Sequence, residues 1–241
     1  MSEMSLVRQR PAPDPNSSTA THGNVVETVS RVSIGRRLSL IAKRVIDVVG
    51  AMILLVLTLP LCVLVGLAVA LDGGPVLYRQ SRVGLSGSTF GCLKFRSMIV
   101  DAADCLEEYL SYHPEAAAEW ASRQKLGFDP RITPVGAFLR RTSLDELPQL
   151  INVLMGDMSL VGPRPIVEYE LKHLYGPVSG GLYTSVRPGI TGLWQVSGRN
   201  TIGYTAQVAM DDHYVRTWSL WQDIKILLRT PGAVLSQRGA S

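Results

Sequence analysis

The stretch that decides the fold is residues 48–71, VVGAMILLVLTLPLCVLVGLAVAL. It holds 24 consecutive residues without a charge, and all but Gly50, Thr58, Pro60 and Gly66 are hydrophobic. As a helix it would be about 36 Å long, enough to cross a hydrocarbon core of about 30 Å. It begins too far into the chain for a removable signal peptide, so we expect it in the mature protein. The sequence therefore predicts a membrane-associated protein and not an ordinary soluble enzyme.

Pro60 lies near the middle of this segment and leaves its topology open between two arrangements. A proline removes the backbone hydrogen bond to the carbonyl of Val56, and the Thr58 hydroxyl can bond to the carbonyl of Leu54, so both residues favour a bend. A helix broken there has two arms of about 18 Å, which reach the bilayer midplane and return. Basic residues, which favour the cytoplasmic side, flank both ends of the segment. A re-entrant and a spanning helix both remain open, because prolines also occur in spanning helices.

Composition narrows the class of protein further. The 241 residues allow one large domain, and only 18% of them are charged, with a net charge of +4. We expect a disordered tail at residues 1–30, which is rich in proline and serine, and a single domain over residues 31–241. The three cysteines and four histidines show neither a disulfide framework nor metal-ligand spacing. No P-loop and no dinucleotide-binding glycine motif occurs, and we expect no nucleic-acid partner.

Local patterns predict the elements around the apolar segment. We expect a basic helix at residues 36–47, short strands at 78–98, a helix at 101–125 interrupted near Pro114, an amphipathic helix at 144–154 ending at Gly156, a glycine-punctuated loop at 187–200 and a last helix at 214–228. Trp218 and Trp221 would share one face of that last helix.

The segment Ser143 to Gln149, SLDELPQ, is the sharpest candidate for chemistry. Ser143 and Glu146 have the spacing of a helix capping box, which would make the segment merely structural. Pro148 argues against an ordinary helix start, because it would forfeit a backbone bond at the fifth helical position. Upstream arginines would keep Asp145 ionised and attract a phosphate. Paired carboxylates beside arginines suit pyrophosphate and metal chemistry, so both interpretations stay open here.

Basic residues elsewhere supply candidate phosphate ligands. In residues 94–98, KFRSM, Lys94 and Arg96 fall on one side of a strand by period-two alternation. Arg164 is fixed between two prolines, which suggests that the orientation of its side chain matters. Residues 187–199 add two arginines and glycine-freed backbone amides. Each of these is also compatible with a solvated surface or a plain turn.

Taken together, these segments resemble the bacterial sugar transferase family, the small monotopic transferases that move hexose-1-phosphate onto polyprenyl phosphate. The resemblance runs from about Lys43 to Leu235, and within the family the chain is most similar to rhizobial initiators of exopolysaccharide synthesis that use galactose-1-phosphate. The motifs that carry it are Asp72 to Tyr78, Arg82-Val83-Gly84, Lys94 to Met98, Asp129-Pro130-Arg131, Thr142 to Asn152, Gly156 to Pro165 and Arg187 to Asn200.

The resemblance implies a mostly helical α/β monotopic membrane protein, with a re-entrant helix at about 48–71 and a catalytic domain on the cytoplasmic face of the inner membrane. It implies transfer of hexose-1-phosphate from a UDP-sugar to undecaprenyl phosphate, with galactose or glucose as the hexose, as the first membrane step of exopolysaccharide synthesis. The lipid bilayer and downstream glycosyltransferases are the further partners it suggests. Relatives often have a Ser-Pro pair at the helix break, whereas this chain has Thr58-Leu59-Pro60, which displaces the hydroxyl by one residue.

The same resemblance assigns roles to residues. Asp145 would attack the sugar-bearing phosphate and release UMP, Glu146 would bind Mg²⁺, and polyprenyl phosphate would then attack the phosphosugar on the aspartate. The residues that would hold the diphosphate and the lipid phosphate are Lys94, Arg96, Arg141, Arg164 and Arg187.

Two hypotheses from other classes remain. A single-pass transmembrane scaffold explains the apolar segment and its basic flanks, and a peripheral lipid-binding module explains the basic patches and the tryptophans. The scaffold does not account for the arginine-rich, proline-braced loops, and a lipid-binding module would bind anionic lipid without metal-dependent turnover of UDP-sugars. The sequence does not specify the hexose, the acceptor chain length or the oligomeric state.

Overall fold

The computed structural model describes residues 34–123, 126–198 and 203–236. The tail predicted at residues 1–30 lies outside them. The chain divides into two compact units, residues 1–41 and 42–241. Helix α2, Ile34–Ala70, begins in the first unit, where Ser39 Oγ donates to the carbonyl of Gly35 at 2.9 Å, and continues into the second. All other described elements belong to the second unit.

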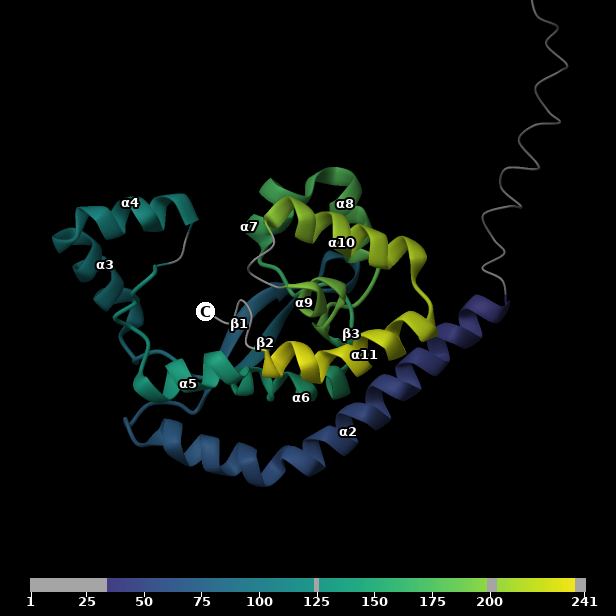
Figure 1. Ribbon diagram of the computed structural model, residues 1–241, viewed down its shortest axis with the longest axis horizontal. Coiled ribbons are helices and arrows are strands. Elements are labelled where there is room, and N and C mark those ends of the chain that lie inside the picture. The colour runs from purple at the N-terminus through teal and green to yellow at the C-terminus, as the bar shows by residue number, and fades with distance from the viewer. Residues whose placement is uncertain (1–33, 124–125, 199–202, 237–241) are drawn as a thin grey trace, which may run out of the picture. The chain divides into compact units, whose positions relative to one another are not determined.

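Helix α2 contains the apolar segment and its predicted basic lead-in, and it is the one described helix long and apolar enough to cross a membrane. Thr58 Oγ1 donates to the carbonyl of Leu54 at 2.7 Å, as predicted, and Pro60 lies inside the helix. Figure 1 shows that the helix changes direction along its length without a break. Most of its apolar side chains are exposed, Val56 and Leu57 among them. Such a continuous apolar surface is what a bilayer covers.

One face of α2 packs on the rest of the second unit. Ala51 is fully buried in the main hydrophobic core, which it shares with buried side chains from five other helices and strands. Val65 and Val69, beyond Pro60, pack in a second core with Phe95. Positions on both sides of the proline therefore contact the same body of protein.

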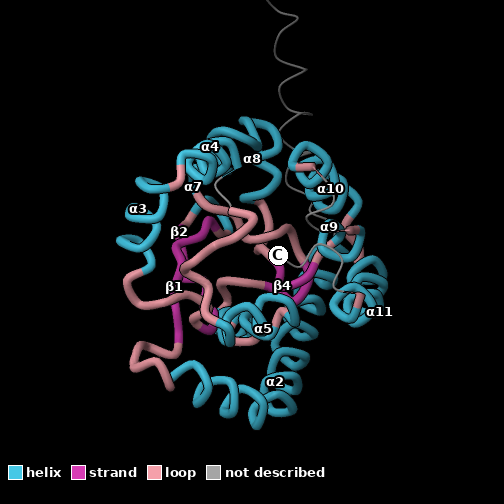
Figure 2. Tube along the Cα trace, turned by 60° about the vertical axis from the view of Figure 1, so that its left-hand side comes forward, coloured by secondary structure: helices cyan, strands magenta, loops and turns pink. Residues whose placement is uncertain are grey.

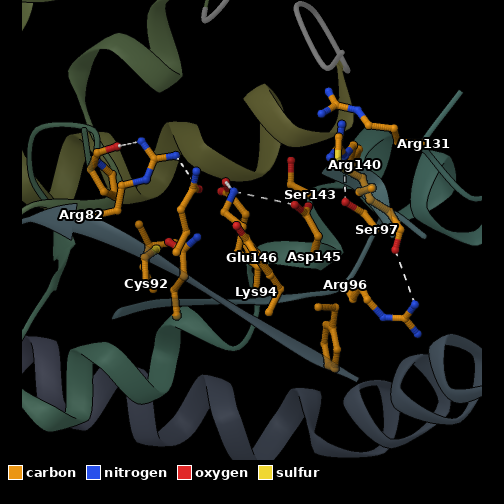
Figure 3. A pocket seen from close by; sticks show the side chains of 18 of the residues that line it. Arg82, Cys92, Lys94, Arg96, Ser97, Arg131, Arg140, Ser143, Asp145 and Glu146 are labelled. Carbon is orange, nitrogen blue, oxygen red and sulfur yellow. Dashed lines mark hydrogen bonds and ion pairs between the residues drawn. The ribbon is translucent and has the colours of Figure 1, made fainter. Parts of the chain in front are cut away.

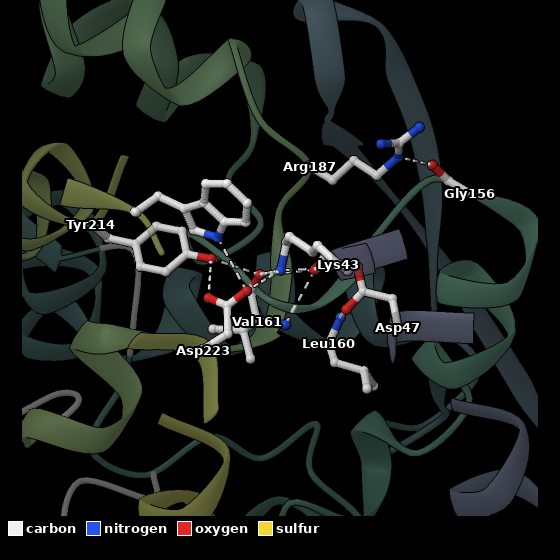
Figure 4. Close-up of polar contacts among 10 residues, drawn as sticks. Lys43, Asp47, Gly156, Leu160, Val161, Arg187, Tyr214 and Asp223 are labelled. Atoms are coloured by element: carbon white, nitrogen blue, oxygen red, sulfur yellow. Dashed lines mark hydrogen bonds and ion pairs between the residues drawn. The ribbon is translucent and has the colours of Figure 1, made fainter. Parts of the chain in front are cut away.

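Polar contacts anchor the start of the apolar segment (Figure 4). Lys43 Nζ donates to Asp223 Oδ2 at 2.7 Å, and both side chains are largely buried. One turn further along α2, the carboxylate of Asp47 accepts from the backbone of Leu160 at 3.0 Å and from Ser159 Oγ at 2.8 Å. These bonds satisfy buried charges that would otherwise be costly.

Arg96 anchors the other end of the segment. Its guanidinium pairs with the carboxylate of Asp72 and donates to the carbonyls of Val69 at 3.1 Å and Pro75 at 2.7 Å. Arg96 is buried, so its charge depends on these partners. Both ends of the apolar segment are thus bonded to the same unit.

Two small sheets lie among the helices (Figure 2). Strand β1, Leu77–Val83, pairs antiparallel with β2, Thr89–Phe95, across the turn η1, Leu85–Gly87, which confirms the strands predicted in 78–98. Strand β3, Ser159–Val161, pairs in parallel with β4, Gly189–Thr191. The loop predicted at 187–200 is therefore wrong in part, because it holds β4 and helix α9, Leu193–Ser197. Its partner β3 is distant in sequence, which local composition does not encode.

The helix predicted at 101–125 is confirmed as α3, Ala102–Tyr112, and α4, Pro114–Arg123, with the break at the expected proline. Gly156, in the left-handed region at φ 97°, ends α6 as predicted. The remaining helices and turns are α5 (Pro134–Thr142), η2 (Leu144–Glu146), α6 (Gln149–Met155), α7 (Glu168–Glu170), η3 (Leu171–Tyr175), α8 (Gly176–Thr184), α10 (Tyr204–Thr217) and α11 (Leu220–Leu235).

The helix predicted at 214–228 is wrong at its start. Helix α10 ends at Thr217 and α11 begins at Leu220, after Ser219 Oγ accepts from the backbone of Gln222 at 3.2 Å as an N-cap. Trp218 and Trp221 therefore do not share a helix face. Trp218 is partly buried and donates to Asp223 at 3.1 Å, whereas Trp221 is exposed.

Candidate active site

A cleft of about 710 Å³ opens beside the β1–β2 hairpin, and it brings Lys94, the adjacent Asp145 and Glu146, and Arg164 together from three parts of the chain. Figure 3 shows Arg82 at one end, Arg140 and Arg131 at the other, and the two carboxylates between them. Other side chains in its wall are Gln80, Cys92, Arg96, Ser97, Ser143, Gln149 and Trp194.

Ser143 decides where the two carboxylates point. It lies in the left-handed region at φ 58°, where it ends α5 and turns the chain into the short 3₁₀ turn that carries Asp145 and Glu146. The capping box between Ser143 and Glu146 is therefore wrong, because Ser143 closes the preceding helix and makes no capping bond to this turn. The helix predicted at 144–154 is therefore wrong at its start, because α6 begins only at Gln149, after Pro148. A non-glycine residue in this region is uncommon and is often found at functional sites.

Helix α5 is held close to the segment after β2. A Cβ on Gly136 would lie 1.9 Å from the carbonyl oxygen of Ser97, so only glycine allows this approach. Thr133 caps the helix by accepting from the backbone of Gly136 at 2.9 Å. The approach lets Arg140 Nε donate to Ser97 Oγ at 2.8 Å and places this guanidinium at the cleft.

Lys94 joins the two carboxylates. Its Nζ lies 2.8 Å from Glu146 Oε1 and 3.8 Å from Asp145 Oδ2. The carboxylates differ in exposure, since the Asp145 side chain is 10% exposed and the Glu146 side chain 37%. Asp145 is thus shielded from water beside a cation, and Glu146 reaches open space in the cleft.

Burial dominates the protonation chemistry of this pair. It raises the pKa of Asp145 to about 6, with Glu146 adding to the rise while Lys94 and Arg140 oppose it. Burial would lower the pKa of Lys94, but the charges of Glu146 and Asp145 outweigh it and the net shift is upward. Lys94 therefore stays charged, and Asp145 ionises near neutral pH. Perturbed titratable groups in a cleft are typical of catalytic sites.

The predicted phosphate ligands do not all converge. Arg164 lines the cleft, with its guanidinium over the Trp194 ring at 5.6 Å. Arg96 also lines it, but its fork is occupied by Asp72 because the strand ends at Phe95 and the alternation stops there. Their assignments to substrate phosphates stay predictions.

Two further predicted ligands lie outside the cleft wall. Arg141 is exposed, and Arg187 Nε donates to the carbonyl of Gly156 at 2.7 Å (Figure 4). The roles of Arg141 and Arg187 as phosphate ligands also stay predictions.

Two cleft arginines, Arg82 and Arg131, were given no role from the sequence, whereas Arg140 is one of the two upstream arginines expected to keep Asp145 ionised and to attract a phosphate. Arg82 and Arg131 stand in motifs that carry the family resemblance, and those motifs are the signal that could have identified them. Their convergence depends on contacts between distant segments, which no local pattern reveals.

The described residues contain no group of three or more His, Cys, Asp or Glu side chains able to hold a metal ion by themselves. Mg²⁺ is commonly held by one or two carboxylates together with substrate phosphates and water. The Asp145–Glu146 pair fits that mode, with Glu146 the more accessible ligand.

Comparisons with known proteins agree with this picture. Residues 38–237 match the family described as bacterial sugar transferase. The chain is 50% identical to a UDP-galactose-lipid carrier transferase of Erwinia amylovora over 88% of its own length and 44% of that protein, and 49% identical to an undecaprenyl-phosphate galactose phosphotransferase of Salmonella typhimurium over 86% and 43%. It spans less than half of these two relatives. It is also 48% identical to the exopolysaccharide production protein ExoY of Rhizobium meliloti, over 83% of this chain and 88% of that protein.

Proposed function

The chain belongs to the bacterial sugar transferase family. On this basis we propose that it transfers hexose-1-phosphate from a UDP-sugar to undecaprenyl phosphate, and that the hexose is galactose or glucose. The observation that carries the proposal is the buried Asp145 carboxylate, held beside Lys94 and Glu146 in a cleft rich in arginine. The names of the relatives support UDP-galactose as donor and undecaprenyl phosphate as acceptor.

In the first half-reaction an oxygen of the Asp145 carboxylate attacks the sugar-bearing phosphorus of the donor. The bond from that phosphorus to the bridging oxygen breaks, and UMP leaves with the bonding electrons. The main obstacle to this attack is repulsion between the carboxylate and the negatively charged phosphate. Cations along the cleft reduce this repulsion by neutralising the phosphate. Lys94 is the nearest of them, at 3.8 Å from Asp145.

In the second half-reaction a phosphate oxygen of undecaprenyl phosphate attacks the same phosphorus and releases Asp145. Splitting the transfer lets a water-soluble donor and a membrane-bound acceptor use one nucleophile in turn. Glu146, with donor phosphates, would hold Mg²⁺, which neutralises charge on the transferred phosphoryl group.

The fold supports a monotopic arrangement, and the basic residues on both flanks of the apolar segment favour the cytoplasmic face of the inner membrane as the side of the cleft. Lys43 and Asp47 anchor one end of the apolar segment, and Asp72 anchors the other, to the same unit. Val65, beyond Pro60, is packed in that unit as well. A straight spanning helix would carry its two ends to opposite sides of the bilayer, so these contacts favour a re-entrant helix.

Turnover is tested by incubating purified protein with Mg²⁺, undecaprenyl phosphate and a panel of UDP-sugars, with UMP release as the readout. We expect release with one or two UDP-hexoses, and none without Mg²⁺ or with Asp145→Asn. Asp101→Asn, an exposed carboxylate at the start of α3, is the matched control and should turn over normally. Lipid binding without any UMP release would favour a lipid-binding module instead.

Sidedness is tested by cysteine labelling in intact cells. Arg37→Cys and Arg79→Cys, both exposed, report the two flanks in a background with Cys62, Cys92 and Cys105 replaced by alanine. We expect an impermeant maleimide to label neither site until the membrane is permeabilised. Labelling of one site alone would mean that the helix spans.

A further inference from the structure

Beyond the carboxylate pair, the cleft holds a second cationic cluster at the end marked by Arg82 (Figure 3). Arg82 on β1 and Arg164 between the two prolines share one carboxylate, Glu170. Glu170 Oε2 lies 3.6 Å from Arg82, and Oε1 lies 3.6 Å from Arg164. Glu170 Oε2 also accepts from the backbone of Val167 at 2.9 Å, which fixes the carboxylate in place.

The charges in this cluster do not balance. Two guanidinium groups face one carboxylate, and distances of 3.6 Å exceed the roughly 2.7–2.9 Å of a charge-assisted hydrogen bond. The hydrogen bonds of Arg82 go to neutral acceptors, the carbonyl of Pro165 at 3.0 Å and Gln80 Oε1 at 2.7 Å. Burial, and then the neighbouring charge of Arg164, lower the pKa of Arg82. An excess positive charge is thus held largely out of water.

Arg164 is the member of the pair that is open to a ligand. Its side chain is 33% exposed, against 12% for Arg82, and within the described part of the chain its guanidinium makes no hydrogen bond. The guanidinium lies over the ring of the buried Trp194, with Cζ 5.6 Å from the ring centroid, which is within the range of a cation–π contact. A planar fork held in this way, with its donors unused, suits the oxygens of a phosphate.

We propose that Arg82 and Arg164 form a phosphate subsite, distinct from the position attacked by Asp145, at the end of the cleft away from Arg140. The subsite rests on the proposed function for its biological ligand, which is either the phosphate of the nucleotide or that of the polyprenyl lipid. Glu170 keeps the two guanidinium groups together when no phosphate is bound. The family resemblance assigns Arg164 a general phosphate role, and the structure adds Arg82 and the location.

The test is equilibrium binding to full-length Asp145→Asn protein in nanodiscs, which needs no turnover and therefore stays informative if the proposed function fails. The probes are inorganic phosphate, UMP and undecaprenyl phosphate. Removing one charge-assisted contact should weaken binding about tenfold or more, so Arg82→Gln and Arg164→Gln should each weaken inorganic phosphate and at least one of the other probes to that extent. Arg79→Gln, an exposed arginine on the same strand, should leave all three unchanged.

The pattern among probes assigns the source of the phosphate. Loss for UMP alone places the nucleotide phosphate at the subsite, loss for the lipid alone places the acceptor there, and loss for both means that the two use it in turn. Arg82→Gln can disturb folding, because Arg82 ties β1 to Pro165, so Arg164→Gln must show the same losses with an unchanged melting temperature. Binding of every probe within twofold of the parent in a folded Arg164→Gln protein would overturn the proposal.

Discussion

Replacing Asp145 by asparagine should abolish activity and yet stabilise the fold, in a manner that depends on pH. Burial raises the pKa of this carboxyl from 3.8 to about 6. Both the folded and the unfolded chain carry the ionised form above pH 6, but the folded chain holds it at an energetic disadvantage of about 3 kcal/mol, since one pKa unit corresponds to about 1.4 kcal/mol. Asparagine has no charge to desolvate, so the variant does not bear this energetic cost in the folded state.

The sign of the effect fixes the pH window. A carboxyl whose pKa is raised on folding takes up protons on folding between pH 3.8 and about 6, so stability falls as the pH rises through that window. The advantage of Asp145→Asn should therefore be about 3 kcal/mol at pH 8 and shrink to about 1 kcal/mol at pH 4.5. For a chain of this size that is a rise in melting temperature of roughly 6–12 °C at pH 8.

The assay is thermal unfolding in nanodiscs at pH 8 and pH 4.5, at one scan rate, followed by tryptophan fluorescence. Asp101→Asn, which is exposed, serves as the control and should change the melting temperature little at either pH. The reasoning fails if Asp145→Asn melts at the wild-type temperature at pH 8, or if its gain is equal at both pH values.

Three further predictions follow from the same contacts. The kcat/KM for UMP release should rise with pH around 6 as Asp145 ionises, and Lys94→Met should move the midpoint upward because it removes a stabilising cation; a flat profile or a downward shift would contradict this. Lys43→Met should destabilise the fold by about 3 kcal/mol by leaving the buried Asp223 without its cationic partner, and Asp223→Asn should restore part of the loss in thermal melts, whereas additive losses would contradict the coupling. Arg140→Gln should lower kcat/KM more than Arg141→Gln, because Arg140 lines the cleft and Arg141 does not. Equal effects would contradict the assignment of this cleft as the active site.

Local rules predicted the parts of the fold that depend on neighbouring residues. The uncharged run predicted α2, the threonine hydroxyl at position 58 made its predicted bond to Leu54, and Pro114 divided the helix where expected. Gly156 ended α6 because a left-handed residue closes a helix, and glycine adopts it without strain.

The wrong predictions share one physical cause, which is that contacts with segments distant in the sequence determine the structure at those positions. Ser143 has the spacing of an N-cap, but it lies in the left-handed region at the end of α5, a helix that packs closely against the distant Ser97, and the turn that follows it carries Asp145 into the cleft. Strand β4 exists because β3 lies beside it, and its glycine-rich sequence alone resembles a loop.

The candidate site was predictable only in part as a set of residues, since Arg82 and Arg131 were missed, and its arrangement was not predictable. The family resemblance supplied Asp145 and Glu146, whereas the contact with Lys94 joins residues that are 52 positions apart in the chain. Arg96 shows the limit of alternation as a guide, since its strand ends one residue before it and Asp72 takes its guanidinium.

The central claim is that Asp145 becomes covalently loaded, and a single-turnover experiment tests it most directly. Protein in nanodiscs is given a UDP-hexose that supports turnover and Mg²⁺, without undecaprenyl phosphate, and is then digested for mass spectrometry. We predict UMP release of about one equivalent and a hexose-phosphate on the peptide that contains Asp145, with both signals absent in Asp145→Asn. UMP release that strictly requires the lipid acceptor, with no modified peptide, would instead mean direct attack by the lipid phosphate in a ternary complex.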